Sequence, residues 1–135
     1  MTNVSKKSLS EKDLNILREQ MNTLISKLDK KGSAYFFNDL LGPEEQIMLL
    51  KRLAAVAMYT EGNSSYRVWT LLRMSPSTAE VIRNDFENGR YENLKVLLTK
   101  NKTDYEAFWR VLESILSAGM PPQGRGRWKS VFDHV

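Results

Sequence analysis

The residues best suited to chemistry are hydroxyl, basic and amide side chains gathered in SSYRVWTLLRMSPSTAEVIRNDF, positions 64–86. Arginine and asparagine can read guanine and adenine edges in the major groove of DNA, and glutamate can accept a hydrogen bond from cytosine. Short hydroxyl side chains at the start of a helix let backbone N–H groups approach phosphates. The pattern therefore favours recognition of a nucleic acid.

Two short helices joined by a tight turn would position these side chains. Ser64 is suited to cap the first helix, on which Val68 and Leu72 lie four residues apart and so share one face. The sequence RMS forms the turn, after which Ser75 caps the second helix and Pro76 takes its first position. This order of signals predicts a helical corner.

The second helix, expected over residues 76–86, has an inner and an outer face. Ala79 and Ile82 would pack inward, which completes the apolar skeleton of a helix-turn-helix. The outward positions are the candidate base-reading residues Ser77, Thr78, Glu80, Val81, Arg83 and Asn84. The candidate phosphate contacts come from the first helix and the turn: Ser64, Ser65, Tyr66, Arg67 and Ser75.

The chain before this corner also has helical patterns. Ser10 and Asp13 fit a capping box, and KKG at 30–32 is expected to end the first helix before Ser33 caps the second. Apolar residues repeat with steps of three and four at Leu14, Leu17, Met21, Leu24 and Leu28. This stripe either packs on the chain's own core or forms a dimer seam.

A third helix is expected to be central and buried, and two more helices should follow the corner. Pro43 suits the first turn of the third helix, and Gly62 ends it. Its broad apolar face comprises Ile47, Leu50, Leu53, Ala54, Ala57 and Met58. YENLKVLLTK predicts a further helix, and a capping box of Thr103 and Glu106 predicts the start of the last. No strand pattern is present, so the fold is expected to be all-α, with about seven helices.

The composition is that of an ordinary soluble globular protein, with 41% hydrophobic and 27% charged residues. The chain has no cysteine, so disulfides are excluded. No apolar run approaches the roughly 20 residues that span a bilayer, and MTNVSKKSLSEKDL is no signal peptide, so we expect a cytoplasmic protein without a membrane partner. The net charge of +4 suits a nucleic-acid binder without proving one.

The stretch FFNDLLGPEEQIMLLKRLAAVAMYTEGNSSYRVWTLLRMSPSTAEVI, about residues 35–85, resembles the Trp repressor superfamily in the order of its signals. The resemblance rests on an acidic PxE start to a long helix, an arginine within it, a glycine after it and a serine-capped corner. It implies an intertwined all-helical homodimer whose recognition helices enter successive major grooves about 34 Å apart. In such a dimer the stripe of Leu14, Leu17, Met21, Leu24 and Leu28 lies at the interface, with Phe36 and Phe37 in the shared core.

The resemblance also bears on a ligand. Arg52 matches a family arginine that helps to hold tryptophan, which makes it the candidate ligand residue. The family's second ligand-binding arginine falls at Val81, which cannot pair with a carboxylate, and a family threonine falls at Gly42. We therefore expect no tryptophan corepressor and no other cofactor. The alternative for Arg52 is an ion pair with an acidic neighbour.

The last segment, GMPPQGRGRWKSVFDHV, differs from the rest in character. RGR resembles the core of AT-hook segments, so Arg125, Arg127 and Lys129 are candidates for an arm in the minor groove of DNA. The alternative is a tail docked on the helices by Trp128 and Phe132. The expected organisation is a dimerisation and helix-turn-helix domain over 1–90, additional helices over 91–118 and this tail over 119–135.

Nothing in the sequence indicates an enzyme or a metal site. The only histidine is His134, and zinc-ligand spacings and a phosphate-binding glycine loop are absent. The sequence therefore predicts a homodimeric, sequence-specific DNA-binding transcriptional regulator. The alternatives are a helical RNA-binding or protein-interaction module that uses the corner for packing, with Tyr66 and Trp69 stacking on bases, and a structural oligomeric adaptor.

Overall fold

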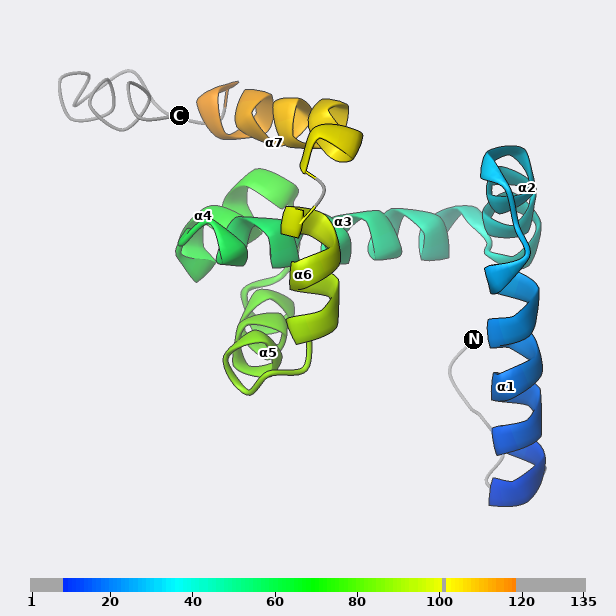
Figure 1. Ribbon diagram of the computed structural model, residues 1–135. Coiled ribbons are helices and arrows are strands. Elements are labelled where there is room, and N and C mark those ends of the chain that lie inside the picture. Colours follow the sequence, from blue (N-terminus) through cyan, green and yellow to red (C-terminus); the bar gives the residue numbers. More distant parts are fainter. Residues whose placement is uncertain (1–8, 101, 119–135) are drawn as a thin grey trace, which may run out of the picture. The chain divides into compact units, whose positions relative to one another are not determined.

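The computed structural model describes residues 9–100 and 102–118, and all regular elements in these ranges are helices (Figure 1). This confirms the all-α class. The chain divides into two compact units, Met1–Gln46 and Ile47–Val135. None of the helices in these ranges combines the length and the apolar character that a bilayer crossing requires.

The first unit contains α1 (Glu11–Ser26) and α2 (Lys30–Leu40). The predicted cap of α1 is confirmed, since Ser10 Oγ accepts a hydrogen bond from the backbone N–H of Asp13 at 3.1 Å. The helix ends sooner than predicted, with Lys27 as its C-terminal cap. Neither α1 nor α2 has a buried residue.

The start of α2 corrects the predicted boundary between the first two helices. Asp29 is its N-terminal cap, and Asp29 Oδ1 accepts a hydrogen bond from the N–H of Gly32 at 2.7 Å. Gly32 and Ser33 therefore lie inside α2, and the prediction that KKG ends one helix while Ser33 caps the next was wrong. The carboxylate of Asp29 prevails because it both accepts from an otherwise unpaired N–H and complements the positive end of the helix dipole.

The second unit is built around the C-terminal half of α3 (Pro43–Thr60). Five successive residues, Ala55–Tyr59, are buried, so this half of the helix is enclosed on all sides. The core that encloses it comes from the later helices, which gather at this end of α3 (Figure 1). The N-terminal half differs, because Ile47–Leu50 are exposed. The predicted burial of α3 therefore holds only for its second half.

The predicted corner is formed by α4 (Ser65–Leu72) and α5 (Pro76–Glu87). Ser64 and Ser75 cap the two helices, and their side chains accept hydrogen bonds from the N–H groups of Arg67 and Thr78. Arg73 makes the turn in a left-handed conformation, with φ 57° and ψ 57°. The inner faces are buried at Val68, Leu72, Ala79 and Ile82. The capping and the apolar skeleton of the corner are thus confirmed.

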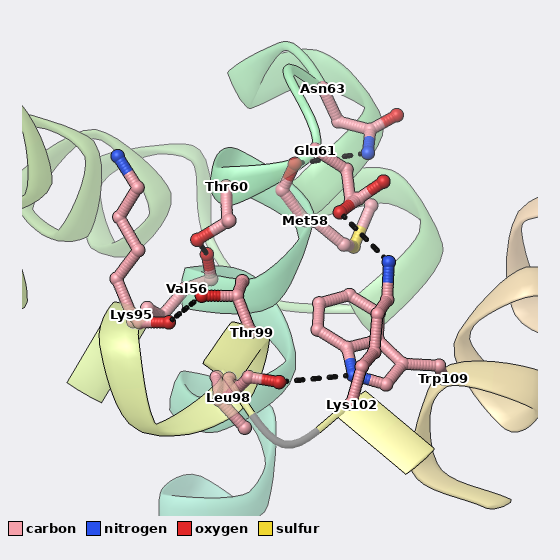
Figure 2. A network of polar contacts seen from close by, with 10 residues as sticks. All are labelled: Val56, Met58, Thr60, Glu61, Asn63, Lys95, Leu98, Thr99, Lys102 and Trp109. Atoms are coloured by element: carbon pink, nitrogen blue, oxygen red, sulfur yellow. Dashed lines mark hydrogen bonds and ion pairs between the residues drawn. The ribbon is translucent and has the colours of Figure 1, made fainter. Parts of the chain in front are cut away.

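The C-terminal helices pack on the end of α3 (Figure 2). They are α6 (Glu92–Lys100), the 3-10 helix η1 (Lys102–Tyr105) and α7 (Glu106–Ala118). Trp109 Nε1 donates to the carbonyl of Leu98 at 3.3 Å, and Lys102 Nζ lies 3.7 Å from Glu61 Oε2 and 4.5 Å from the Trp109 ring centroid. The predicted capping box of Thr103 does not form, because Thr103 lies inside the tighter 3-10 turn.

The hydroxyl of Tyr59 joins three helices of the second unit. It donates to the carbonyl of Ala79 in α5 at 2.8 Å and lies 3.1 Å from Ser65 Oγ in α4. A phenol has one proton, so the Ser65 hydroxyl is the donor in the second bond. Burial raises the pKa of Tyr59, and this effect is larger than that of the Ser65 hydrogen bond, which lowers the pKa. The neutral phenol therefore holds α4 and α5 at one point on α3.

Replacing Tyr59 by Phe should lower the free energy of unfolding by about 1–3 kcal/mol, because it leaves a buried carbonyl and a hydroxyl without their partner. Denaturant unfolding followed by circular dichroism at a fixed protein concentration measures this loss. The matched control is Tyr66→Phe, at a tyrosine residue that is 66% exposed, and its loss of unfolding free energy should stay within about 0.5 kcal/mol. Equal losses for the two variants would contradict the role of the Tyr59 hydroxyl.

Candidate nucleic-acid interface

The outer face of α5 presents most of the candidate base-reading side chains together. Five of the six are exposed: Ser77, Glu80, Val81, Arg83 and Asn84. Thr78 is half-buried. A short helix with its inner face in a core and its outer face exposed can enter a major groove, which is about 12 Å wide.

The hydroxyl groups at the start of α5 bond to one another. Ser75 Oγ donates to Thr78 Oγ1 at 2.7 Å and lies 3.2 Å from Ser77 Oγ. The same Ser75 oxygen accepts from the backbone N–H of Thr78 at 3.1 Å. The cluster fixes the first turn of α5 and gathers three hydroxyls at the positive end of the helix dipole.

The charge of α5 is not that of a simple phosphate binder. The helix carries three carboxylates, Glu80, Asp85 and Glu87, against one guanidinium, Arg83. Arg83 Nε donates to Glu87 Oε2 at 3.1 Å, and this hydrogen bond raises the pKa of Arg83. The bond uses Nε, which leaves the two terminal nitrogens of the guanidinium for another acceptor. Arg83 can therefore contact a base edge while it stays bonded to Glu87.

Two cations at the turn were missed by the sequence reasoning. Lys51 Nζ in α3 donates to the carbonyl of Arg73 at 2.8 Å, where the ammonium complements the negative end of the α4 dipole. Arg73 itself is exposed and is the only non-glycine residue with positive φ in the described ranges. The sequence did contain a signal for Arg73, because a basic side chain in the predicted turn RMS could have been named as a candidate phosphate contact. No local signal marks Lys51, which lies 22 residues away.

The candidate phosphate contacts on α4 differ in how available their side chains are. Tyr66 is exposed, whereas Ser65 is half-buried and bonded to Tyr59. Arg67 is half-buried, and burial lowers its pKa. Trp69 packs edge-to-face against Tyr66, with ring centroids 5.7 Å apart, and against the core. The proposed stacking surface of two exposed aromatics is therefore corrected to Tyr66 alone.

A cavity of about 200 Å³ lies beside α5 and contains the candidate ligand residue Arg52. Its walls are formed by Arg52, Ser77, Thr78, Val81, Ile82, Asp85, Arg90 and Tyr91. Arg90 Nη1 is paired with Asp85 Oδ2 at 2.8 Å, which raises the pKa of Arg90. The ion pair considered for Arg52 is absent from the described residues.

Three of the seven candidate dimer residues are exposed in the first unit. Leu17, Met21 and Leu24 are exposed. The other four, Leu14, Leu28, Phe36 and Phe37, are half-buried.

The candidate minor-groove residues Arg125, Arg127 and Lys129 lie outside the described residues. Within the described ranges, no cluster of histidine, aspartate and glutamate could hold a metal ion.

Comparison of the chain with models of protein families, with curated proteins and with solved structures gives no match.

Replacing Arg73 by Gly should raise the free energy of unfolding by up to about 1 kcal/mol, because glycine adopts a left-handed conformation without the clash of a Cβ. Thermal and denaturant unfolding measure the change. The matched control is Arg52→Gly inside α3, which should lower the free energy by about 1 kcal/mol. A comparable loss for Arg73→Gly would show that the turn does not need the left-handed residue.

Proposed function

We propose that the chain is a sequence-specific DNA-binding transcriptional regulator that acts as a homodimer and inserts α5 into the major groove. The observation that carries the proposal is the corner itself. Two capped helices meet at a left-handed turn, their inner faces are buried, and the second exposes a polar outer face. The hydrogen bonds of Tyr59 hold this helix on the core, so its side chains meet DNA in one orientation.

Base reading is assigned to the outer face of α5. Arg83 and Asn84 have the donors that recognise guanine and adenine edges, and Glu80 can accept from cytosine. Val81 is 59% exposed and can contact the methyl group of thymine. Ser77 and Thr78, in the first turn, lie where a helix dipole favours phosphate.

Phosphate attraction must come from residues outside α5, because that helix has an excess of carboxylates. Tyr66, Arg67 and Arg73 surround the corner and belong to α4 and the turn. The tail with its candidate arginines would add positive charge in the minor groove. Affinity should therefore fall steeply with salt, since contacts of cations with phosphates release counterions.

The homodimer is proposed on the exposed stripe of α1. Leu17, Met21 and Leu24 follow the three–four spacing of a helix seam and are exposed. Two copies would place two α5 helices on one duplex, and each would read one half of a palindromic site. We propose that this regulator works in the cytoplasm. We also propose that it works without tryptophan, because the apolar side chain of Val81 stands where the resemblance places a cation for the carboxylate of that ligand.

The alternative is a helical module that uses the corner to bind another protein or RNA. The carboxylates of α5 and the exposed Val81 favour a protein partner over RNA. Half-burial of Trp69 removes one of the two stacking surfaces that RNA would use.

Replacing both Thr78 and Arg83 by Ala should weaken binding to the preferred duplex at least about tenfold, because the base contact of Arg83 alone is worth about 1–3 kcal/mol and the loss of the Thr78 hydroxyl adds to it. Fluorescence anisotropy at a fixed salt concentration measures the affinity. The matched control is Thr99→Ala with Arg110→Ala, an exposed threonine and arginine on α6 and α7. This control should bind within about twofold of the parent chain.

Circular dichroism must show that both double variants keep their helices. If the change on α5 leaves DNA binding unaltered, α5 is not the recognition helix. If the parent chain binds no duplex even at low salt, the DNA-binding proposal fails.

A further inference from the structure

The N-terminal half of α3 exposes four apolar side chains in succession. Ile47, Met48, Leu49 and Leu50 are 52%, 41%, 41% and 55% exposed. Successive residues of an α-helix point about 100° apart, so these four surround the helix axis. A contiguous apolar surface of this kind marks an interaction site. Residues 47–50 thus form an exposed apolar girdle around this part of α3.

One stripe through the girdle has an ordered set of charges. Glu45, Met48, Leu49 and Arg52 follow the spacing i, i+3, i+4 and i+7, so they share one face of α3. The face thus runs from a carboxylate through two apolar side chains to a guanidinium. Glu45 and Arg52 are both exposed.

This stripe complements a second copy of itself in antiparallel orientation. With a two-fold axis between Met48 and Leu49, each Met48 faces the partner copy's leucine and each Glu45 faces the partner copy's arginine. The two ends of the contact are identical, as an isologous interface requires. Glu45 accepts from the N–H of Gly42 through Oε1 at 2.8 Å, which leaves Oε2 for a guanidinium. Arg52 has no ion-pair partner among the described residues.

We propose that this stripe of α3, formed by Glu45, Met48, Leu49 and Arg52, pairs antiparallel with the same stripe of a second copy of this chain. The stripe has a carboxylate at one end and a guanidinium at the other, and this order of charges favours a second copy as the partner. An antiparallel copy supplies an apolar surface for Met48 and Leu49 and presents its own charges in the opposite order. The inference deepens the homodimer of the proposed function and rests on it, but does not depend on DNA binding. It adds a second contact to the α1 seam.

Charge reversal tests the pairing directly. In Glu45→Arg alone, two arginines face two arginines across the axis, and in Arg52→Glu alone four carboxylates meet. Each variant should self-associate at least about tenfold more weakly than the parent chain, because like charges at an interface repel. A mixture of the two variants should restore dimers, since every facing pair is then of opposite charge. Light scattering coupled to size-exclusion chromatography measures the mass of each species over a concentration series.

The controls separate this pairing from a loss of fold or of general charge. Glu92→Arg changes a glutamate in the first turn of another helix and should leave the mass unchanged. Leu49→Asp should dissociate the dimer, whereas Leu97→Asp, at an exposed leucine of α6, should not. Recovery of dimers in the mixture shows that both charge variants remain folded.

The pairing is overturned if each charge variant alone has the mass of the parent dimer, or if the mixture does not restore dimers. In that case Leu24→Asp on α1 tells whether the proposed homodimer stands. If this variant is monomeric while the parent chain is a dimer, the α1 seam is the dimer interface. A monomeric parent chain overturns both the pairing and the homodimer.

Discussion

The buried hydroxyl of Tyr59 is the contact on which the geometry of the corner depends. It connects the end of α3 to the carbonyl of Ala79 in α5 and to the hydroxyl of Ser65 in α4. Apolar packing alone would let the two helices slide, whereas a buried hydrogen bond has one good geometry and is costly to leave unmade. Burial raises the pKa of Tyr59. The stability from its neutral form is therefore complete below about pH 10 and is lost as the pH rises through the raised pKa.

The corner has the capped helices and the buried inner faces of a helix-turn-helix, but α5, which we propose as the recognition helix, is not basic. Its specificity and its phosphate attraction are therefore assigned to different residues. Arg83 can read a base while Glu87 restrains its guanidinium, and the carboxylates of α5 discourage non-specific phosphate binding. In the proposed regulator, cations at the turn and on α4, including Arg73, would supply the attraction that α5 does not. On this proposal, DNA binding would depend on both parts of the corner.

Sequence signals predicted the corner well because they are local. Ser64, Ser75 and Pro76 are sufficient to start its two helices, and the inward faces follow from helical periodicity. The boundary between α1 and α2 was misplaced because Asp29 is as good a cap as the later serine and comes first in the chain. Contacts between distant residues, such as Lys51 with the turn, have no local signal. Periodicity predicted the apolar face of α3, but it does not tell which part of that face lies inside the core.

The central claim, that a pair of α5 helices reads duplex DNA, is tested most directly by selection from random-sequence duplexes with the full-length protein. The account predicts a palindromic motif whose half-sites lie one helical turn, about 34 Å, apart. Such a motif requires the corner and the dimer together. Recovery of sequences with no shared motif, or of no bound duplex at low salt, would contradict the claim.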